Sequence, residues 1–276
     1  MPAHEQVIAP QPENPVANSG LATRMPDRAA LREALAVYAG VSVITWLLSR
    51  FQSLPVLRSH LHLVVGMLFL VTALRCAERL PGGAERYGLA LGGLLGDARD
   101  EADTAAAREG GALSDLLASL CASFPSFLAE LGVAALVCAL VFPPFVLGFY
   151  LWHAPVRPFA WLPDQDMPAY ALTQVIVVGL PEEALFRGYL QGRLEDAWPK
   201  SLRLLGAHVS LGALLGQAAL FGVLHFVVDY NPARLAVFFP ALLFGWVRAL
   251  RGGIGAAIFV HAGCNLLSDL LIRGWL

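Results

Sequence analysis

The sequence has few charged residues for its length. Only 14% of its 276 residues are Asp, Glu, Lys or Arg, whereas soluble domains carry about 25%. Hydrophobic residues make up 57%, and the mean hydropathy is +0.61. This composition excludes an ordinary soluble domain and indicates an integral membrane protein. The formal net charge of −2 argues against a nucleic-acid partner.

Several sequence patterns are also missing. No Gly-x-Ser-Gly or Gly-x-Gly-Asp lies in an apolar run, so a rhomboid-type serine site and a presenilin-type aspartyl site find no support. No His-Glu-x-x-His is present for a zinc protease. Residues 1–30 lack the apolar core of a signal peptide and predict a disordered tail. Four cysteines without disulfide or zinc spacing are expected to be small buried hydrophobes: Cys76, Cys121, Cys138 and Cys264.

Long apolar runs make up most of the sequence after residue 30. Each is judged against the roughly 20 residues that cross a bilayer, and together they predict an all-α bundle of about seven transmembrane helices. The last four contain the polar residues considered below, and the active site is therefore expected there. We expect a tail over 1–30, an N-terminal membrane region over 31–168 and a catalytic membrane core over 169–276. The polar stretch 75–115 predicts a surface loop, with an amphipathic helix over 113–127. The predicted spans are 31–48, 57–74, 127–152, 170–190, 204–228, 235–250 and 254–272.

The basic residues predict how the chain lies in the membrane. With a cytoplasmic N-terminus, 13 of the 19 Arg and Lys residues lie on the cytoplasmic side, five lie outside or at the outer edge of a span, and Arg187 lies within one. Arginine outnumbers lysine 18 to 1, a bias that suggests a GC-rich bacterial genome. We therefore expect a multi-pass protein of a bacterial cytoplasmic membrane. Because His225 comes late in an outward-running span, the active site is expected to open outward.

Three charged side chains lie within one predicted span, although an ionised group at bilayer depth costs roughly 2.5–3.5 kcal/mol on insertion scales. Glu183 and Arg187 are i,i+4 neighbours on a helix and can form an ion pair. Glu182 is rotated from Glu183 by about 100° and has no such partner, which suits a general base. The alternative is that all three form one buried ion cluster that holds helices together.

Two later spans carry further polar residues. His225 ends the sequence Phe221-Gly-Val-Leu-His225, and His261 and Asn265 are i,i+4 neighbours. An imidazole and an amide on one helix face can donate to a developing oxyanion. The alternatives are an interfacial histidine at 225 and a simple interhelical hydrogen-bond pair at 261 and 265.

These three motifs together resemble those of the CPBP family of CAAX prenyl endoproteases and bacteriocin-processing or immunity proteins. They are Glu-Glu-x-x-x-Arg (182–187), Phe-x-x-x-His (221–225) and His-x-x-x-Asn (261–265), in that order. The resemblance covers about residues 170–276 and implies a glutamate-dependent intramembrane endoprotease. In that mechanism, Glu182 and His225 would activate water, and His261 and Asn265 would stabilise the oxyanion. The implied catalytic residues are Glu182, His225, His261 and Asn265, supported by Glu183, Arg187 and Phe221.

Other chemistries stay open at this point. Glu182, His225 and His261 could offer zinc three ligands, although we expect no cofactor because one carboxylate cannot easily serve as both ligand and base. A thiol nucleophile at Cys264, a transporter and a catalytically idle scaffold or immunity protein are further alternatives. The expected partners are the lipid bilayer and a membrane-anchored protein or peptide. The substrate segment would be a membrane anchor, a bacteriocin leader or a C-terminal sorting tail of the kind that myxosortase-like members cleave.

Overall fold

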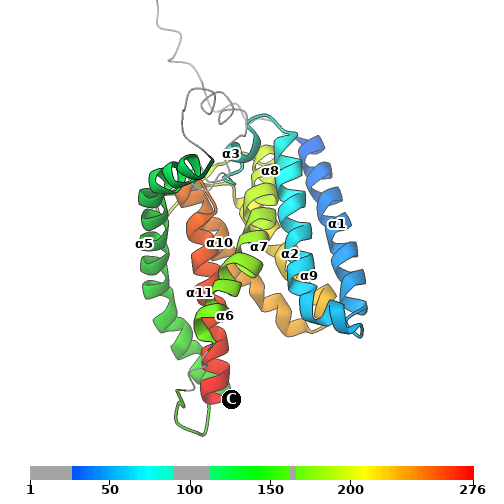
Figure 1. Ribbon diagram of the computed structural model, residues 1–276. Helices are drawn as coiled ribbons and strands as arrows, with labels where there is room; N and C mark the ends of the chain where they lie inside the picture. Colours follow the sequence, from blue (N-terminus) through cyan, green and yellow to red (C-terminus); the bar gives the residue numbers. More distant parts are fainter. Residues whose placement is uncertain (1–26, 90–111, 162–165) are drawn as a thin grey trace, which may run out of the picture.

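A computed structural model describes residues 27–89, 112–161 and 166–276. Within these residues, seven helices are long and apolar enough to cross a membrane, and Figure 1 shows them side by side. The predicted all-α membrane bundle is therefore confirmed. Many large apolar side chains point outward, among them Leu136 and Leu140 at 62% and 67% exposure, as expected for a surface that faces lipid. The seven spans are Arg28–Arg50, Arg58–Glu78, Ser123–His153, Met167–Ala197, Leu211–Asp229, Pro232–Arg251 and Gly255–Trp275.

The first three spans are regular helices. The side chain of Asp27 caps α1 (Arg28–Arg50) by accepting from the backbone N–H groups of Ala29 and Ala30. The predicted tail therefore ends before Asp27, and residues 1–26 lie outside the described part. After α2 (Pro55–Glu78), helix α5 (Ala112–His153) continues through three prolines and includes the predicted amphipathic segment.

The fourth span is an irregular helix. It runs through α6 (Met167–Thr173), the π-helix η2 (Gln174–Gly179), α7 (Leu180–Glu183), the π-helix η3 (Ala184–Leu190) and α8 (Gln191–Ala197). Pro181 has no N–H to donate to the carbonyl of Val177, so the α-helical ladder is interrupted there. Gly66 of α2 approaches that carbonyl so closely that a Cβ at position 66 would lie 2.8 Å from it. Single π-helical turns of this kind often accompany functional sites.

A β-hairpin precedes the fifth span, and its presence corrects the predicted boundary at 204. Strands β1 (Leu202–Leu204) and β2 (Ala207–Val209) pair in antiparallel fashion. Leu205 and Gly206 between them both have positive φ, 45° and 87°, which suits a two-residue hairpin turn. Helix α9 (Leu211–Asp229) begins only after Ser210, whose side chain caps it. The apolar composition of the strands had made the run look continuous.

The last two spans complete the helical bundle. The 3₁₀ turn η4 (Pro232–Val237) leads into α10 (Phe238–Arg251). Gly252 then caps α10 in the left-handed conformation with φ 77°, the usual place for glycine at a helix end. Helix α11 (Gly255–Trp275) follows and packs along α5.

The polar stretch is not simply a surface loop, and this prediction is wrong for residues 75–89. Helix α2 continues to Glu78, and the short helix α3 (Gly83–Arg86) is followed by Tyr87 and Leu89, each only 1% exposed. The carbonyl of Gly88 accepts from the backbone N–H of Ile254 at 3.1 Å. This segment therefore contacts both the fourth span and the turn between α10 and α11. Residues 90–111 lie outside the described part.

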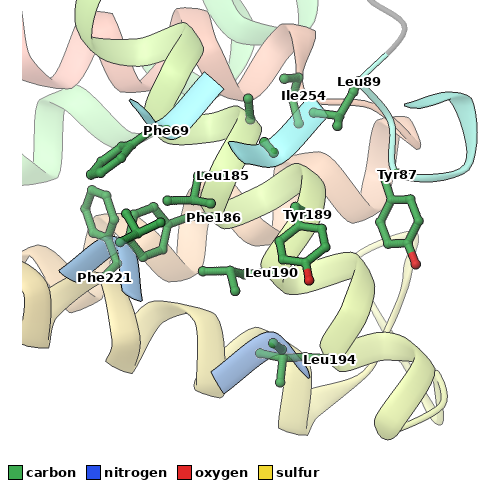
Figure 2. Packing of buried hydrophobic residues seen from close by; sticks show 14 of the residues in the cluster. Phe69, Tyr87, Leu89, Leu185, Phe186, Tyr189, Leu190, Leu194, Phe221 and Ile254 are labelled. Atoms are coloured by element: carbon green, nitrogen blue, oxygen red, sulfur yellow. The ribbon is translucent and has the colours of Figure 1, made fainter. Parts of the chain in front are cut away.

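One hydrophobic core joins the N-terminal helices to the later spans. Figure 2 shows Phe69 of α2 and Phe221 of α9 around Phe186, with ring centroids 6.1 Å and 4.9 Å from that ring. Tyr87 and Leu89 extend the same core. The predicted regions on both sides of 168/169 contribute to this core. The division between them stays a prediction. The cysteines with described side chains, Cys76, Cys138 and Cys264, are free and half-buried.

We predict that Gly192→Ala destabilises the protein. A Cβ there would lie 2.5 Å from the ring of Tyr87, and overpacking of this kind costs about 1–3 kcal/mol. The control is Gly40→Ala in α1, where a Cβ would meet nothing within 4 Å. Thermal unfolding of the detergent-solubilised variants measures both; an equal Tm for the two would contradict the packing of residues 87–89.

Candidate active site

A fully buried carboxylate, Glu183, is at the centre of the site. Its Oε1 accepts from Nη1 of Arg187 at 2.9 Å and from Nδ1 of His261 at 2.7 Å. The Glu183 and Arg187 side chains are both 0% exposed, and buried charges persist only when they are paired. The ion pair expected from the i,i+4 spacing is present, and it reaches a third residue on α11 that spacing could not indicate.

Aromatic rings enclose the guanidinium of Arg187. Its Cζ lies 4.4 Å from the ring centroid of Phe221 and 5.0 Å from that of Phe244, distances at which cation–π attraction operates. The Phe244 ring also stacks on His261 at 4.8 Å with an interplanar angle of 16°. Sequence reasoning missed Phe244, because a phenylalanine in an apolar helix carries no distinguishing signal.

Glu182 has a different environment from its neighbour. Its side chain is 20% exposed, and its Oε2 lies 3.7 Å from Nε2 of His261. That oxygen has no hydrogen-bond partner among the described residues. The His261 ring therefore lies between the two carboxylates, with Nδ1 bonded to Glu183 and Nε2 facing Glu182. One carboxylate is held by an ion pair, while the other is partly accessible.

His225 is connected to His261 by the ring of Phe221, which lies near both imidazoles. Its Nδ1 lies 2.9 Å from the carbonyl oxygen of Phe221, which can only accept, so Nδ1 carries the proton and Nε2 is left as the second functional nitrogen. The Phe221 ring is 4.4 Å from the His225 ring and 6.1 Å from that of His261. Among the described residues, no hydrogen bond or ion pair joins His225 to Glu182.

Asn265 is held by a residue that sequence reasoning did not select. Its Nδ2 donates to Oε1 of Gln174 at 2.8 Å. Gln174 is the first residue of η2 and only 9% exposed. The only sequence signal was an amide in an apolar run, two turns before Glu182.

The residues do not fit the zinc set considered from the sequence. In the described ranges, no three His, Cys, Asp or Glu side chains are grouped as metal ligands. Each histidine bonds through Nδ1, His261 to Glu183 and His225 to a backbone carbonyl, which leaves Nε2 as the nitrogen that could face a ligand. Independence from metal stays a prediction.

Comparison with known proteins identifies one family. Residues 164–267, which include all three motifs, match the family model described as type II CAAX prenyl endopeptidase Rce1-like. No curated protein and no solved structure matches the chain.

We predict that Arg187→Leu strongly destabilises the fold, because it leaves the Glu183 carboxylate buried without its cation. Removing one partner of a buried ion pair costs about 3–5 kcal/mol. The matched control is Arg75→Leu, whose side chain is 72% exposed and pairs with Glu78 at 3.5 Å; exposed pairs contribute about 0–1 kcal/mol. Thermal unfolding in detergent should separate the two variants, and equal losses would contradict a structural ion pair at Arg187.

Proposed function

Because residues 164–267 belong to the Rce1-like family of type II CAAX prenyl endopeptidases, we propose that the protein is an intramembrane endopeptidase in which Glu182 activates the hydrolytic water. The family indicates a protease that acts on membrane-anchored substrates, and seven apolar helices make this chain a multi-pass membrane protein. The observation that carries the proposal is the difference between the two adjacent carboxylates. Glu183 is enclosed and paired, whereas Glu182 is partly exposed beside His261.

The charges of this group support hydrolysis by water. Glu182, Glu183, Arg187 and a doubly protonated His261 would together carry no net charge. Nδ1–H would then stay bonded to Glu183, while Nε2–H would be free to donate to a substrate oxyanion. Fixed donors aimed at developing charge are the usual means by which such sites lower the barrier.

The proposed reaction adds one water across the peptide bond. Glu182 takes a proton from water, and the hydroxide attacks the scissile carbonyl carbon. His261 and Asn265 stabilise the oxygen that becomes negative. Glu182 then returns the proton to the departing amine, and the products are a carboxylate and an amine. His225, with Nδ1 fixed by the Phe221 carbonyl, would assist through Nε2.

The proposed substrate is a membrane-anchored protein, because the site residues lie on candidate membrane spans. The protein would cleave a membrane-anchored protein near its anchor or its C-terminal tail, as a sorting-tail protease of the myxosortase kind does. We propose that the N-terminus is cytoplasmic, that the membrane is a bacterial inner membrane, and that the site opens outward onto exported substrates.

We predict that Glu182→Gln abolishes cleavage without unfolding the protein, because the amide cannot accept the water proton. The measurement is terminal proteomics of membranes from cells that carry either form. Cleaved termini present with the wild type should fall by about 100-fold or more, because a general base typically contributes about 100- to 10,000-fold. The control is Glu78→Gln, whose side chain is 51% exposed and pairs with Arg75 at 3.5 Å.

The same experiment separates the alternatives. A scaffold or immunity protein would keep its phenotype in the Glu182→Gln strain, and this result would contradict the proposal. Treatment of the purified enzyme with a chelator should leave cleavage unchanged. A loss that zinc restores would instead support the zinc-dependent form.

The orientation predicts which positions a membrane-impermeant thiol reagent reaches. In a background without native cysteines, Asp229→Cys at the end of α9 should be labelled from outside. Lys200→Cys, between α8 and β1, should be labelled only from the cytoplasm. Both side chains are accessible, at 38% and 41%. Labelling of position 229 from the cytoplasmic side alone would overturn an outward-opening site.

A further inference from the structure

A buried amide, Gln174, and a partly buried one, Asn265, connect the fourth span to α11 beside the catalytic group. Oε1 of Gln174 accepts from Nδ2 of Asn265 at 2.8 Å. The two residues are 91 positions apart in the chain, and Gln174 is 9% exposed. None of the three motifs includes Gln174, and the reaction described above assigns it no role.

The orientation of the Asn265 amide decides what it can do. An asparagine side chain has an acceptor oxygen at one end and an NH₂ group with two donors at the other, and its terminal torsion is nearly two-fold. Only the NH₂ group can stabilise an oxyanion. With Oε1 of Gln174 opposite Nδ2, one N–H is bonded and the other is left free. Turning the amide over would place two oxygens together and leave both without a donor, which is costly in a buried site.

The Gln174 side chain also has a polar neighbour on its own span. Tyr170, four residues earlier, interacts with the Gln174 side chain through its hydroxyl. With Nε2 toward this hydroxyl, Oε1 is left to face α11. The π-helical turn that begins at Gln174 lies between this pair and the Pro181–Glu182 segment.

The opposite helix presents a matching polar face. His261, Asn265, Asp269 and Arg273 follow one another at intervals of four on α11, and Asp269 pairs with Arg273 at 2.8 Å. His261 contacts Glu183, and Asn265 contacts Gln174. Two neighbouring positions of this face, His261 and Asn265, therefore each contact a polar residue of the fourth span.

We propose that Gln174 is a positioning residue, which fixes the Asn265 amide so that its free N–H points to the oxyanion. This inference rests on the proposed function, since it needs an oxyanion at that place. Gln174 would act through Asn265 and would not itself touch the substrate.

The test is a double-mutant cycle with Gln174→Leu, Asn265→Ala and the double variant. The probe is a synthetic peptide that spans the strongest Glu182-dependent cleavage site found by terminal proteomics, and the enzyme is the full chain in proteoliposomes. Gln174→Leu should lower kcat about 10- to 100-fold, as small misplacements of catalytic groups do, and should leave KM within about threefold because transition-state contacts act on kcat. In the Asn265→Ala background, the same substitution should cause no further loss.

A matched control and a rescue variant keep the test independent of folding. Gln217→Leu removes another buried glutamine, which bonds the backbone carbonyls of Leu214 and Ala241 and no catalytic residue. It should keep the wild-type kcat in the folded fraction. Gln174→Glu retains the acceptor when its carboxyl is ionised, whereas the protonated carboxyl can donate and turn the Asn265 amide over. Its kcat relative to the wild type should therefore rise with pH.

Each outcome decides the inference. An unchanged kcat in Gln174→Leu, equal losses in Gln217→Leu, or losses that multiply fully in the double variant would overturn the role of Gln174 while leaving the protease intact. An absence of any Glu182-dependent cleavage would overturn the proposed function and this inference with it.

Discussion

The shared hydrogen bonds of Glu183 determine the arrangement of the site. A single buried oxygen accepts from Arg187 on its own helix and from His261 on α11. Because a buried carboxylate needs its partners, this junction fixes the relative position of two spans that are far apart in the chain. It also orients the His261 ring so that its second nitrogen faces Glu182. The catalytic role proposed for Glu182 therefore depends on a neighbour that takes no part in the proposed chemistry.

The irregular fourth span and the helices around it support this junction. Pro181 and the π-helical turns on either side place Gln174, Glu182 and Arg187 on a helix that departs from regular α geometry. Aromatic rings from α9 and α10 cover Arg187. The segment at Tyr87 and Leu89 closes the opposite side of the helix against Gly192 and Gly188. The N-terminal region thus contributes packing to a site whose polar residues lie in later spans.

The sequence alone was sufficient to predict features that depend on local composition or on the spacing of nearby residues. Seven apolar runs gave the spans, and the four-residue spacing gave the pair of Glu183 with Arg187. Contacts between distant segments could not be predicted in this way. Phe244 and the buried Tyr87 carry no local signal, and Gln174 carries only that of an amide in an apolar run, because each of these residues acquires its role from what packs against it. The hairpin at 202–209 was missed because apolar strand residues extend an apolar run.

The central claim is that adjacent glutamates have separate roles, and one paired measurement tests it most directly. Thermal unfolding and peptide cleavage would be recorded for Glu182→Gln and Glu183→Gln in the same detergent. The account predicts that Glu182→Gln keeps the wild-type Tm and loses cleavage, whereas Glu183→Gln lowers the Tm markedly because Arg187 loses its counterion. Equal destabilisation by both substitutions, or continued cleavage by Glu182→Gln, would contradict it.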